Sequence, residues 1–220
     1  MKRENVFYEN IYFVYALSLF LFFLAWFALA FRTTPLFFPS PWLVFRVFVD
    51  MVKDGSLWGH IEISLFRILT GWAIGSGLGI PLGLLMGDIR FIRNMLNPYI
   101  QFFRFIPPIS FVPLSLIWFG MGETSKVALI IYTTIFIVTI NTIAGVMSVN
   151  VIHVQGALSL GAKRFNIFTR VILPSTIPFL LTGMRLAMGN SFMTIVSAEM
   201  IAADKGLGFL IFTSRLFMQT

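Results

Sequence analysis

The sequence predicts an all-α protein, a bundle of helices that crosses a membrane several times. Hydrophobic residues make up 58% of the chain and charged residues 11%, whereas soluble domains average about 25% charged residues. The mean hydropathy is +0.89 over the whole length. Apolar runs of about 20 residues recur, which is the length a helix needs to cross the hydrocarbon of a bilayer. We therefore expect one polytopic transmembrane domain over residues 1–220.

Five spans are expected, together with one helix that lies in the membrane interface. The first span, residues 11–31, is too long for the apolar core of a signal peptide, and no small-x-small cleavage site follows it, so we expect it to stay uncleaved. Residues 42–52 mix charged and apolar side chains, which favours an interfacial helix. The remaining spans are predicted at residues 64–87, 97–119, 125–147 and 178–199, before an amphipathic tail at 201–220.

Glycines and prolines inside two of these spans predict how they pack. The second span carries a stripe of glycines four residues apart, at Gly71, Gly75, Gly79, Gly83 and Gly87. Such a stripe lets another backbone approach closely, either as tight packing or as a moving contact in a gate. Pro81 predicts a kink in the same span. The third span is interrupted by Pro107, Pro108 and Pro113, so its freed carbonyls should be buried in protein or face a cavity.

A polar segment at residues 150–174 separates the last two spans and predicts two short helices. Gly161 supplies a bend between them. After the bend, apolar and polar side chains are expected on opposite helix faces, Phe165, Phe168 and Ile172 on one and Lys163, Asn166 and Arg170 on the other. This pattern fits a helix pair that enters a partner's groove, or a helix that rests on lipid.

Charged residues inside the spans are candidates for a translocation pathway. Arg104 lies near the inner end of the third span, and Arg185 lies about 10 Å into the fifth at 1.5 Å per residue. Charges in hydrocarbon are costly, so each has either a functional role or a structural one, as a buried partner or a head group that reaches the interface. Glu199 is the third candidate, with an ion pair to Lys205 as its alternative role.

Several other classes of function are excluded by what the sequence lacks. The net charge is +7, but the basic residues are scattered between apolar runs and form no face for a nucleic acid. There is no cysteine, and His60 and His153 have no companion at metal-ligand spacing, so neither a metal nor another cofactor is expected. A phosphate-binding loop of the Gly-x4-Gly-Lys-Ser/Thr type is also absent, so any ATP must be used by a partner.

An ordered set of short motifs resembles one known family. The motifs are Pro39-Ser40-Pro41, Ser64-Leu65 with Arg67 and Gly71, Arg104 to Pro108, Pro113-Leu114, Trp118 to Glu123, Gly183 with Arg185 and Ala187, and Ala198-Glu199. Together with segment 150–174, they resemble the binding-protein-dependent ABC importer permeases of the nitrate, sulfonate, taurine and bicarbonate type. The resemblance extends from about Pro39 to Phe212.

The resemblance identifies segment 150–174 as the loop that couples such permeases to their ATPase. The family pattern is Glu-Ala-Ala, three residues, Gly and then a helix ended by Pro. This chain has Gln155 and Gly156 in place of the Glu and the first Ala. Glutamine keeps a side chain of the same length that forms hydrogen bonds, so coupling should survive. The coupling residues that the resemblance implies are Gln155, Gly156, Ala157, Gly161, Ala162, Phe165 and Pro174.

The resemblance also implies the partners and the fold. The fold would be a type I ABC importer permease, a multi-pass protein of the bacterial inner membrane surrounded by lipid. ABC ATPase subunits, a periplasmic or lipid-anchored substrate-binding protein and a second permease copy would complete the importer. Permeases of this group usually continue into a sixth span after the Gly-Leu-Gly stretch, which the sequence to Thr220 lacks.

The implied cargo is a small anion such as nitrate, a sulfonate, taurine or bicarbonate, with Arg104, Arg185 and Glu199 along its path. A vitamin precursor or another small organic molecule is the alternative cargo. An integral-membrane enzyme and a membrane scaffold are the other classes. A cytoplasmic coupling loop places the N-terminus and residues 88–97 inside, with seven basic residues inside against six outside, so charge alone does not fix the orientation.

Overall fold

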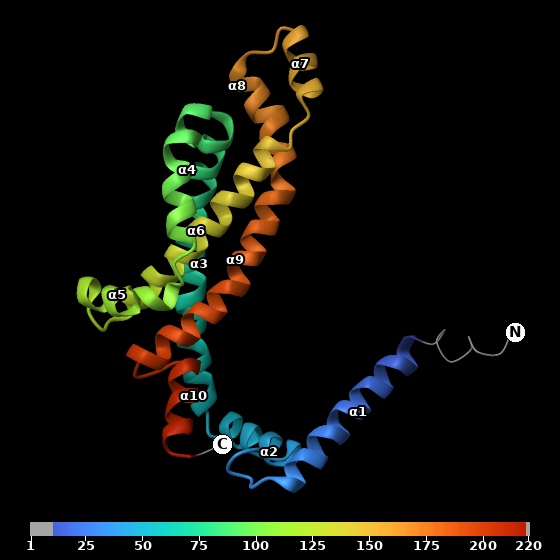
Figure 1. Ribbon diagram of the computed structural model, residues 1–220, viewed down its shortest axis with the longest axis vertical. Helices are drawn as coiled ribbons and strands as arrows, with labels where there is room; N and C mark the ends of the chain where they lie inside the picture. The colour runs from blue at the N-terminus through green and yellow to red at the C-terminus, as the bar shows by residue number, and fades with distance from the viewer. Residues whose placement is uncertain (1–10, 219–220) are drawn as a thin grey trace, which may run out of the picture. The chain divides into compact units, whose positions relative to one another are not determined.

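The computed structural model describes residues 11–218, and these residues are helical throughout apart from turns and short connections (Figure 1). Part of the expected topology rests on residues that lie outside the described ones, namely Lys2, Arg3 and Thr220. The chain divides into two compact units, one of residues 1–59 and 211–220 and one of residues 60–210. The two units are described separately below.

The first unit contains two helices, α1 (Ile11–Arg32) and α2 (Pro41–Lys53). None of the α1 side chains is buried, and Trp26 Nε1 donates a hydrogen bond to the carbonyl of Pro39 at 3.0 Å. Ser40 caps α2 by accepting from the N–H of Leu43, and Pro41 occupies the first turn, where a missing N–H costs nothing. Hydrogen bonds from the side chain and backbone N–H of Ser56 lower the pKa of the Asp54 carboxyl.

The second unit holds the helices that position the candidate sites. They are α3 (Ser56–Asp88), which begins in the first unit, α4 (Arg90–Arg104), η1 (Pro108–Phe111), α5 (Val112–Phe119), α6 (Glu123–Met147), α7 (Val151–Ser159), α8 (Arg164–Ile167), the π-helical η2 (Phe168–Ile172), α9 (Leu173–Ala202) and α10 (Leu207–Leu216), which ends in the first unit. Over both units, the described residues contain four helices long and apolar enough to cross a membrane, and a fifth span if α4 and α5 count as one bent pair.

The third predicted span is broken, as its prolines indicate. The two halves meet at an angle of 88°. Proline residues cannot donate to the helix ladder, so carbonyl groups at the break need other partners. Tyr132 on α6 supplies one, because its hydroxyl donates to the carbonyls of Phe103 at 2.5 Å and Ile106 at 3.4 Å.

Three predicted boundaries were wrong. The second and third spans begin at Ser56 and Arg90, earlier than expected, so Arg104 lies at the far end of α4 rather than near its start. The last span is one helix of 39 residues, Arg164–Ala202, rather than a helix that begins at Pro178. Pro174 falls in the first turn of α9 directly after the π-helical turn, where the chain passes the proline without ending the helix. The helix α3 is likewise unbroken across Pro81.

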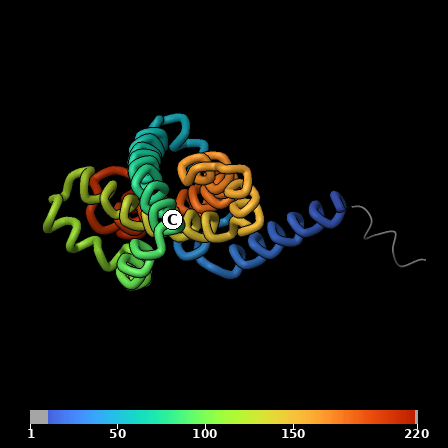
Figure 2. Tube along the Cα trace, turned by 90° about the horizontal axis from the view of Figure 1, so that it is seen from above, coloured from blue at the N-terminus to red at the C-terminus, as the bar shows by residue number. Residues whose placement is uncertain are grey.

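The glycine stripe of α3 packs against α6, which runs obliquely across α3 and α9 (Figure 1, Figure 2). A Cβ atom added to Gly75 would lie 2.6 Å from the Cβ of Thr134, and one added to Gly83 would lie 2.5 Å from the Cβ of Thr142. The facing α6 side chains also recur every four residues, at Ile130, Thr134, Val138, Thr142 and Val146. In lipid, where apolar burial drives little association, such close packing holds helices together.

Candidate functional site

The coupling segment is built from α7, a tight turn and the start of the long α8–α9 helix. Asn150 caps α7 by accepting from the N–H of Ile152 at 2.9 Å. The turn depends on Gly161, whose φ of 77° lies in the left-handed region. The N–H groups of Gly161 and Ala162 close the turn by donating to the carbonyls of Leu158 and Ala157, at 2.9 and 3.0 Å. The sequence predicted this bend at Gly161.

Large apolar side chains of this segment are exposed. Leu160 is 89% exposed, Phe165 74% and Ile152 70%. Gln155 and Gly156 are exposed as well, and Gly156 has no neighbouring atom within 4 Å of an added Cβ. Phe165 therefore does not share one buried face with Phe168 and Ile172, which are half-buried. These side chains present apolar surface on the coupling segment.

The coupling segment is joined to α3 by one ion pair. Arg164 Nη2 lies 3.2 Å from Asp88 Oδ2, at the last residue of α3. A cavity of about 430 Å³ lies beside this pair and is lined by Leu84, Leu85, Asp88, Arg164, Phe165 and Phe168. The position of α8 is thus tied to the end of α3 as well as to α9.

The three predicted pathway residues lie in different environments. Arg104 is exposed, its guanidinium lies 4.8 Å from the ring centre of Phe105, and it lines a cavity of about 270 Å³. Arg185 is exposed on α9, and within the described residues no ion pair involves it. Glu199 is fully buried. The expected pairing of Glu199 with Lys205 is wrong, because Glu199 binds Arg67.

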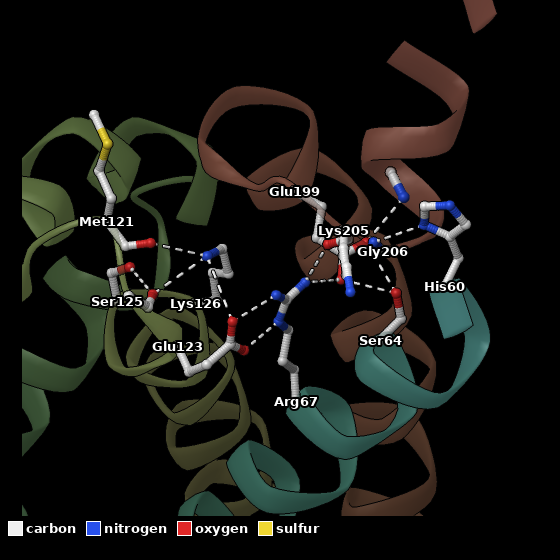
Figure 3. A network of polar contacts seen from close by, with 12 residues as sticks. His60, Ser64, Arg67, Met121, Glu123, Ser125, Lys126, Glu199, Lys205 and Gly206 are labelled. Carbon is white, nitrogen blue, oxygen red and sulfur yellow. Dashed lines mark hydrogen bonds and ion pairs between the residues drawn. The ribbon is translucent and has the colours of Figure 1, made fainter. Parts of the chain in front are cut away.

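Arg67 is the centre of a buried charge network (Figure 3). Only 2% of Arg67 is exposed. Its Nη1 donates to Glu199 Oε1 at 2.8 Å and to the carbonyl of Lys205 at 2.8 Å. On the other side, its Nε and Nη2 donate to the two carboxylate oxygens of Glu123 at 2.5 and 2.7 Å. One guanidinium therefore joins α3, α6, the end of α9 and the turn that follows it.

Glu199 receives further hydrogen bonds from α3 and from the first turn of α10. Its carboxylate accepts from Ser64 Oγ at 2.8 and 3.0 Å and from the N–H of Gly208 at 2.9 Å. Gly206 has a φ of 130°, and a Cβ there would collide with the carboxylate of Glu199. His60 Nδ1 accepts from the N–H of Gly206 at 3.0 Å. Because the carboxylate is enclosed on all these sides, it has no free oxygen for a passing cargo.

Lys126 completes the network and balances its charge. Its Nζ donates to the carbonyls of Met121 at 3.0 Å and Gly122 at 3.3 Å and lies 3.9 Å from Glu123 Oε1. Two cations, Arg67 and Lys126, thus face two carboxylates. A compensated group of this kind satisfies charges that would be costly alone at the edge of a membrane.

The sequence analysis named Glu199 but not its partners. In the sequence, Arg67 and Glu123 were noted only as members of two family motifs. Arg67 nevertheless lies well inside an apolar span. The pairing could have been expected from the charges alone, because a cation and a carboxylate that lie in different spans each need an oppositely charged partner. Within residues 11–218, no group of three or more His, Cys, Asp or Glu side chains is placed to hold a metal ion.

Comparison with known proteins gives one family and a fold. A family model described as "Binding-protein-dependent transport system inner membrane component" matches residues 79–220. The chain is 40% identical over 193 residues to the taurine transport system permease protein TauC of Escherichia coli (strain K12), covering 85% of this chain and 70% of that protein. It is 35% identical over 182 residues to the putative aliphatic sulfonates transport permease protein SsuC of Bacillus subtilis (strain 168), covering 83% and 66%.

The fold is also similar to a solved transporter. An inward-facing structure of the MetNI methionine ABC transporter superposes with a TM-score of 0.64 at 16% identity, covering 73% of this chain and 82% of that one. At this level of identity the likeness concerns the fold alone.

Proposed function

Because the chain belongs to the family of binding-protein-dependent transport system inner membrane components, we propose that residues 150–174 dock its ATPase and that its cargo is a small anion. The protein is a multi-pass permease subunit of an ABC importer in the inner membrane, and ATP is hydrolysed by a separate subunit. A substrate-binding protein is the other partner that membership of this family implies. A second permease copy is part of the proposal, because so few spans seldom enclose a pathway alone.

The observation that carries the docking proposal is the exposed apolar surface at Leu160, Phe165 and Ile152. The surface sits on a turn shaped by the left-handed backbone of Gly161, with the exposed Arg164–Asp88 ion pair beside it. From Arg164 the helix continues without interruption to Ala202. Its 39 residues correspond to about 58 Å at 1.5 Å per residue, so a displacement at the docking surface would be passed to one long helix, which includes the π-helical turn η2.

Substitution of Gly161 tests the coupling role. Gly161→Asn should retain activity, because asparagine tolerates the left-handed backbone. Gly161→Trp should lower cargo-stimulated ATP hydrolysis and uptake by about tenfold or more, because a bulky residue is strained at this φ and covers the surface. Both rates are measured on the reconstituted importer.

Gly77→Trp is the matched control for added bulk. Gly77 lies on α3 with no atom within 4 Å of an added Cβ, so the same change there should leave both rates near the wild-type values. Cargo-stimulated ATP hydrolysis and uptake at wild-type rates in Gly161→Trp would contradict the docking proposal.

The cargo proposal rests on a cation without an acidic partner and on the relatives. Arg185 is exposed on α9, on the side opposite the buried Gly183 and Ala187, and no described ion pair neutralises it. The relatives named for taurine and for aliphatic sulfonates are both named for sulfonate cargo. A positive side chain in a pathway would favour such anions.

Charge-changing variants of Arg185 test the pathway role. Arg185→Lys should keep part of the anion uptake, since the positive charge remains while bidentate binding is lost. Arg185→Gln should assemble normally and lose uptake. The measurements are ATP-dependent uptake in proteoliposomes and the yield of assembled complex. Assembled Arg185→Gln complexes with normal uptake would contradict the pathway role, and a failure to assemble would show a structural role instead.

A further inference from the structure

Two cavities follow one another along α6, and Tyr132 lies where they meet. The first cavity has a volume of about 270 Å³, and the α6 residues that line it lie between Tyr132 and Asn141. The second has a volume of about 260 Å³, and its α6 residues lie between Ala128 and Tyr132. Of the described residues, Tyr132 alone lines both cavities.

The order of the lining residues gives the pair of cavities a direction. The second cavity lies toward Glu123, where α6 starts, and the first lies toward Met147, where it ends. From Ala128 to Asn141 the helix rises by about 20 Å at 1.5 Å per residue, which is about two-thirds of the hydrocarbon thickness of a bilayer. Joined together, the cavities would form a route along α6 through most of the membrane. In this conformation the side chain of Tyr132 stands between them.

Two aromatic neighbours hold the ring of Tyr132 in this position. The ring of Phe111, which lines the second cavity, lies 4.7 Å from it between centroids. The ring of Phe136, which lines the first cavity, lies 5.1 Å from it. Aromatic rings at such distances attract one another, so the three rings form a row that passes from one cavity to the other.

The hydroxyl of Tyr132 ties the same ring to the broken span. In an unbroken helix the carbonyl of Phe103 would accept from the N–H four residues later, which Pro107 lacks. The Tyr132 hydroxyl donates to this carbonyl at 2.5 Å and, more weakly, to that of Ile106 at 3.4 Å. A movement of the bend between α4 and η1 would therefore move the ring as well.

We propose that Tyr132 is the gate residue between the two cavities, closed in this conformation, and that the two cavities are successive parts of the route that cargo takes. The ring leaves its place between the cavities when the bend between α4 and η1 moves. The proposal rests on the proposed function and deepens it, since it names the residue that interrupts the route.

Cysteine accessibility tests the gate, because the chain has no cysteine of its own. Asn141→Cys places a thiol in the first cavity and Ser115→Cys places one in the second. A membrane-impermeant methanethiosulfonate reagent is added to the assembled permease–ATPase complex in vesicles, on the side from which Met121→Cys is labelled. The choice of side then does not depend on the orientation of the protein. From that side, Ser115→Cys lies before the gate and Asn141→Cys lies behind it.

Two variants of Tyr132 should open the gate to different extents. Tyr132→Phe keeps the ring and removes the hydroxyl, so it should speed the modification of Asn141→Cys by about tenfold, as the loss of one hydrogen bond allows. Tyr132→Ala, which also removes the ring, should speed it further. Both variants should leave the rate at Ser115→Cys unchanged, which separates opening of the gate from a general loosening of the protein.

Tyr99→Phe is the matched control for the loss of a hydroxyl. Tyr99 is an exposed tyrosine on α4 that lines neither cavity, and no described hydrogen bond involves its side chain. The rates at both cysteines should therefore stay at their wild-type values in Tyr99→Phe.

Blocking the first cavity tests whether cargo passes through it. After complete modification, the group attached at Asn141→Cys should lower ATP-dependent uptake by about tenfold or more. The same group attached at Tyr99→Cys, outside both cavities, should leave uptake unchanged.

The results that overturn this inference differ from those that overturn the proposed function. An unchanged rate at Asn141→Cys in both Tyr132→Phe and Tyr132→Ala rejects the gate, and so does an equal acceleration at Ser115→Cys. Normal uptake after complete modification of Asn141→Cys rejects the route. Cargo-stimulated ATP hydrolysis by the unmodified wild-type complex reports the importer function without reference to either cavity. If that hydrolysis is normal, any of these results rejects the gate or the route alone.

Discussion

At the scale of single residues, the molecule separates buried charges that join its helices from exposed charges that have no described carboxylate partner. Arg67 and Glu199 are 2% and 0% exposed and lie 2.8 Å apart. Arg104 and Arg185 are exposed and have no described carboxylate partner. A buried ion pair adds little net stability over an apolar pair, but the loss of one partner leaves an uncompensated charge.

We predict that Arg67→Gln destabilises the protein by about 3–5 kcal/mol, because Glu199 stays buried without a cationic partner. Glu199→Gln should destabilise it less, because Arg67 keeps its ion pair with Glu123. The double variant Arg67→Met with Glu199→Met should recover much of that loss, since both charges of the pair are then removed. Thermal unfolding of the purified complex measures the effect. If both single variants are as stable as the wild type, the network does not stabilise the fold.

At the scale of elements, small residues decide which helices lie side by side. The α3 glycines face α6 side chains at the same four-residue interval, and the contact is close enough for Thr139 Oγ1 to donate to the carbonyl of Gly79 at 3.2 Å. A similar contact joins α6 to α9, where a Cβ on Gly145 would lie 2.7 Å from the Cβ of Phe179. The glycine stripe is therefore a packing surface in this conformation.

We predict that Gly75→Leu prevents stable folding or lowers the melting temperature strongly, because even the first added carbon would lie 2.6 Å from Thr134 Cβ. Gly77→Leu on the same helix is the control, since it meets no atom within 4 Å. Expression level and thermal unfolding of the two variants are compared side by side. A gate that opens along this surface would instead show a Gly75→Leu protein that folds normally but fails to transport.

At the scale of the whole molecule, the proposed function requires the coupling segment and the charge network to face opposite sides of the membrane. Helix α7, which leads into the turn at Gly161, follows the end of α6, whereas Met121 and Glu123 lie at the start of α6. A helix of 25 residues is long enough to cross the hydrocarbon once. Leu160 and Met121, 89% and 80% exposed, mark the two ends.

The natural absence of cysteine makes this topology directly measurable. A membrane-impermeant maleimide should label Leu160→Cys only in inside-out vesicles and Met121→Cys only in right-side-out vesicles. Both positions are exposed side chains, so neither substitution should disturb packing. Labelling of both from the same side would mean that a span is miscounted, and the reverse pattern would place the coupling segment outside the cell.

The sequence by itself determined the features that depend on local chemistry. The all-helical membrane fold, the break at Pro107 and Pro108 and the bend at Gly161 all follow from hydrophobicity and from the backbone limits of proline and glycine, and the structure confirms them. The family resemblance is confirmed by the comparison with known proteins. Each of these signals can be read along the chain, from composition, short motifs and their order, so no knowledge of the packing is needed.

Only the tertiary structure decided the partners. Arg67 meets Glu123 across 56 positions of sequence and Glu199 across 132, and no local pattern states which spans adjoin. The structure therefore shows Glu199 buried and paired with Arg67, and it places Arg104 beside a cavity. The observed helix boundaries differ from the predicted ones for the same reason. Packing decides where α9 begins, and a proline near the start of a helix does not prevent the helix from forming.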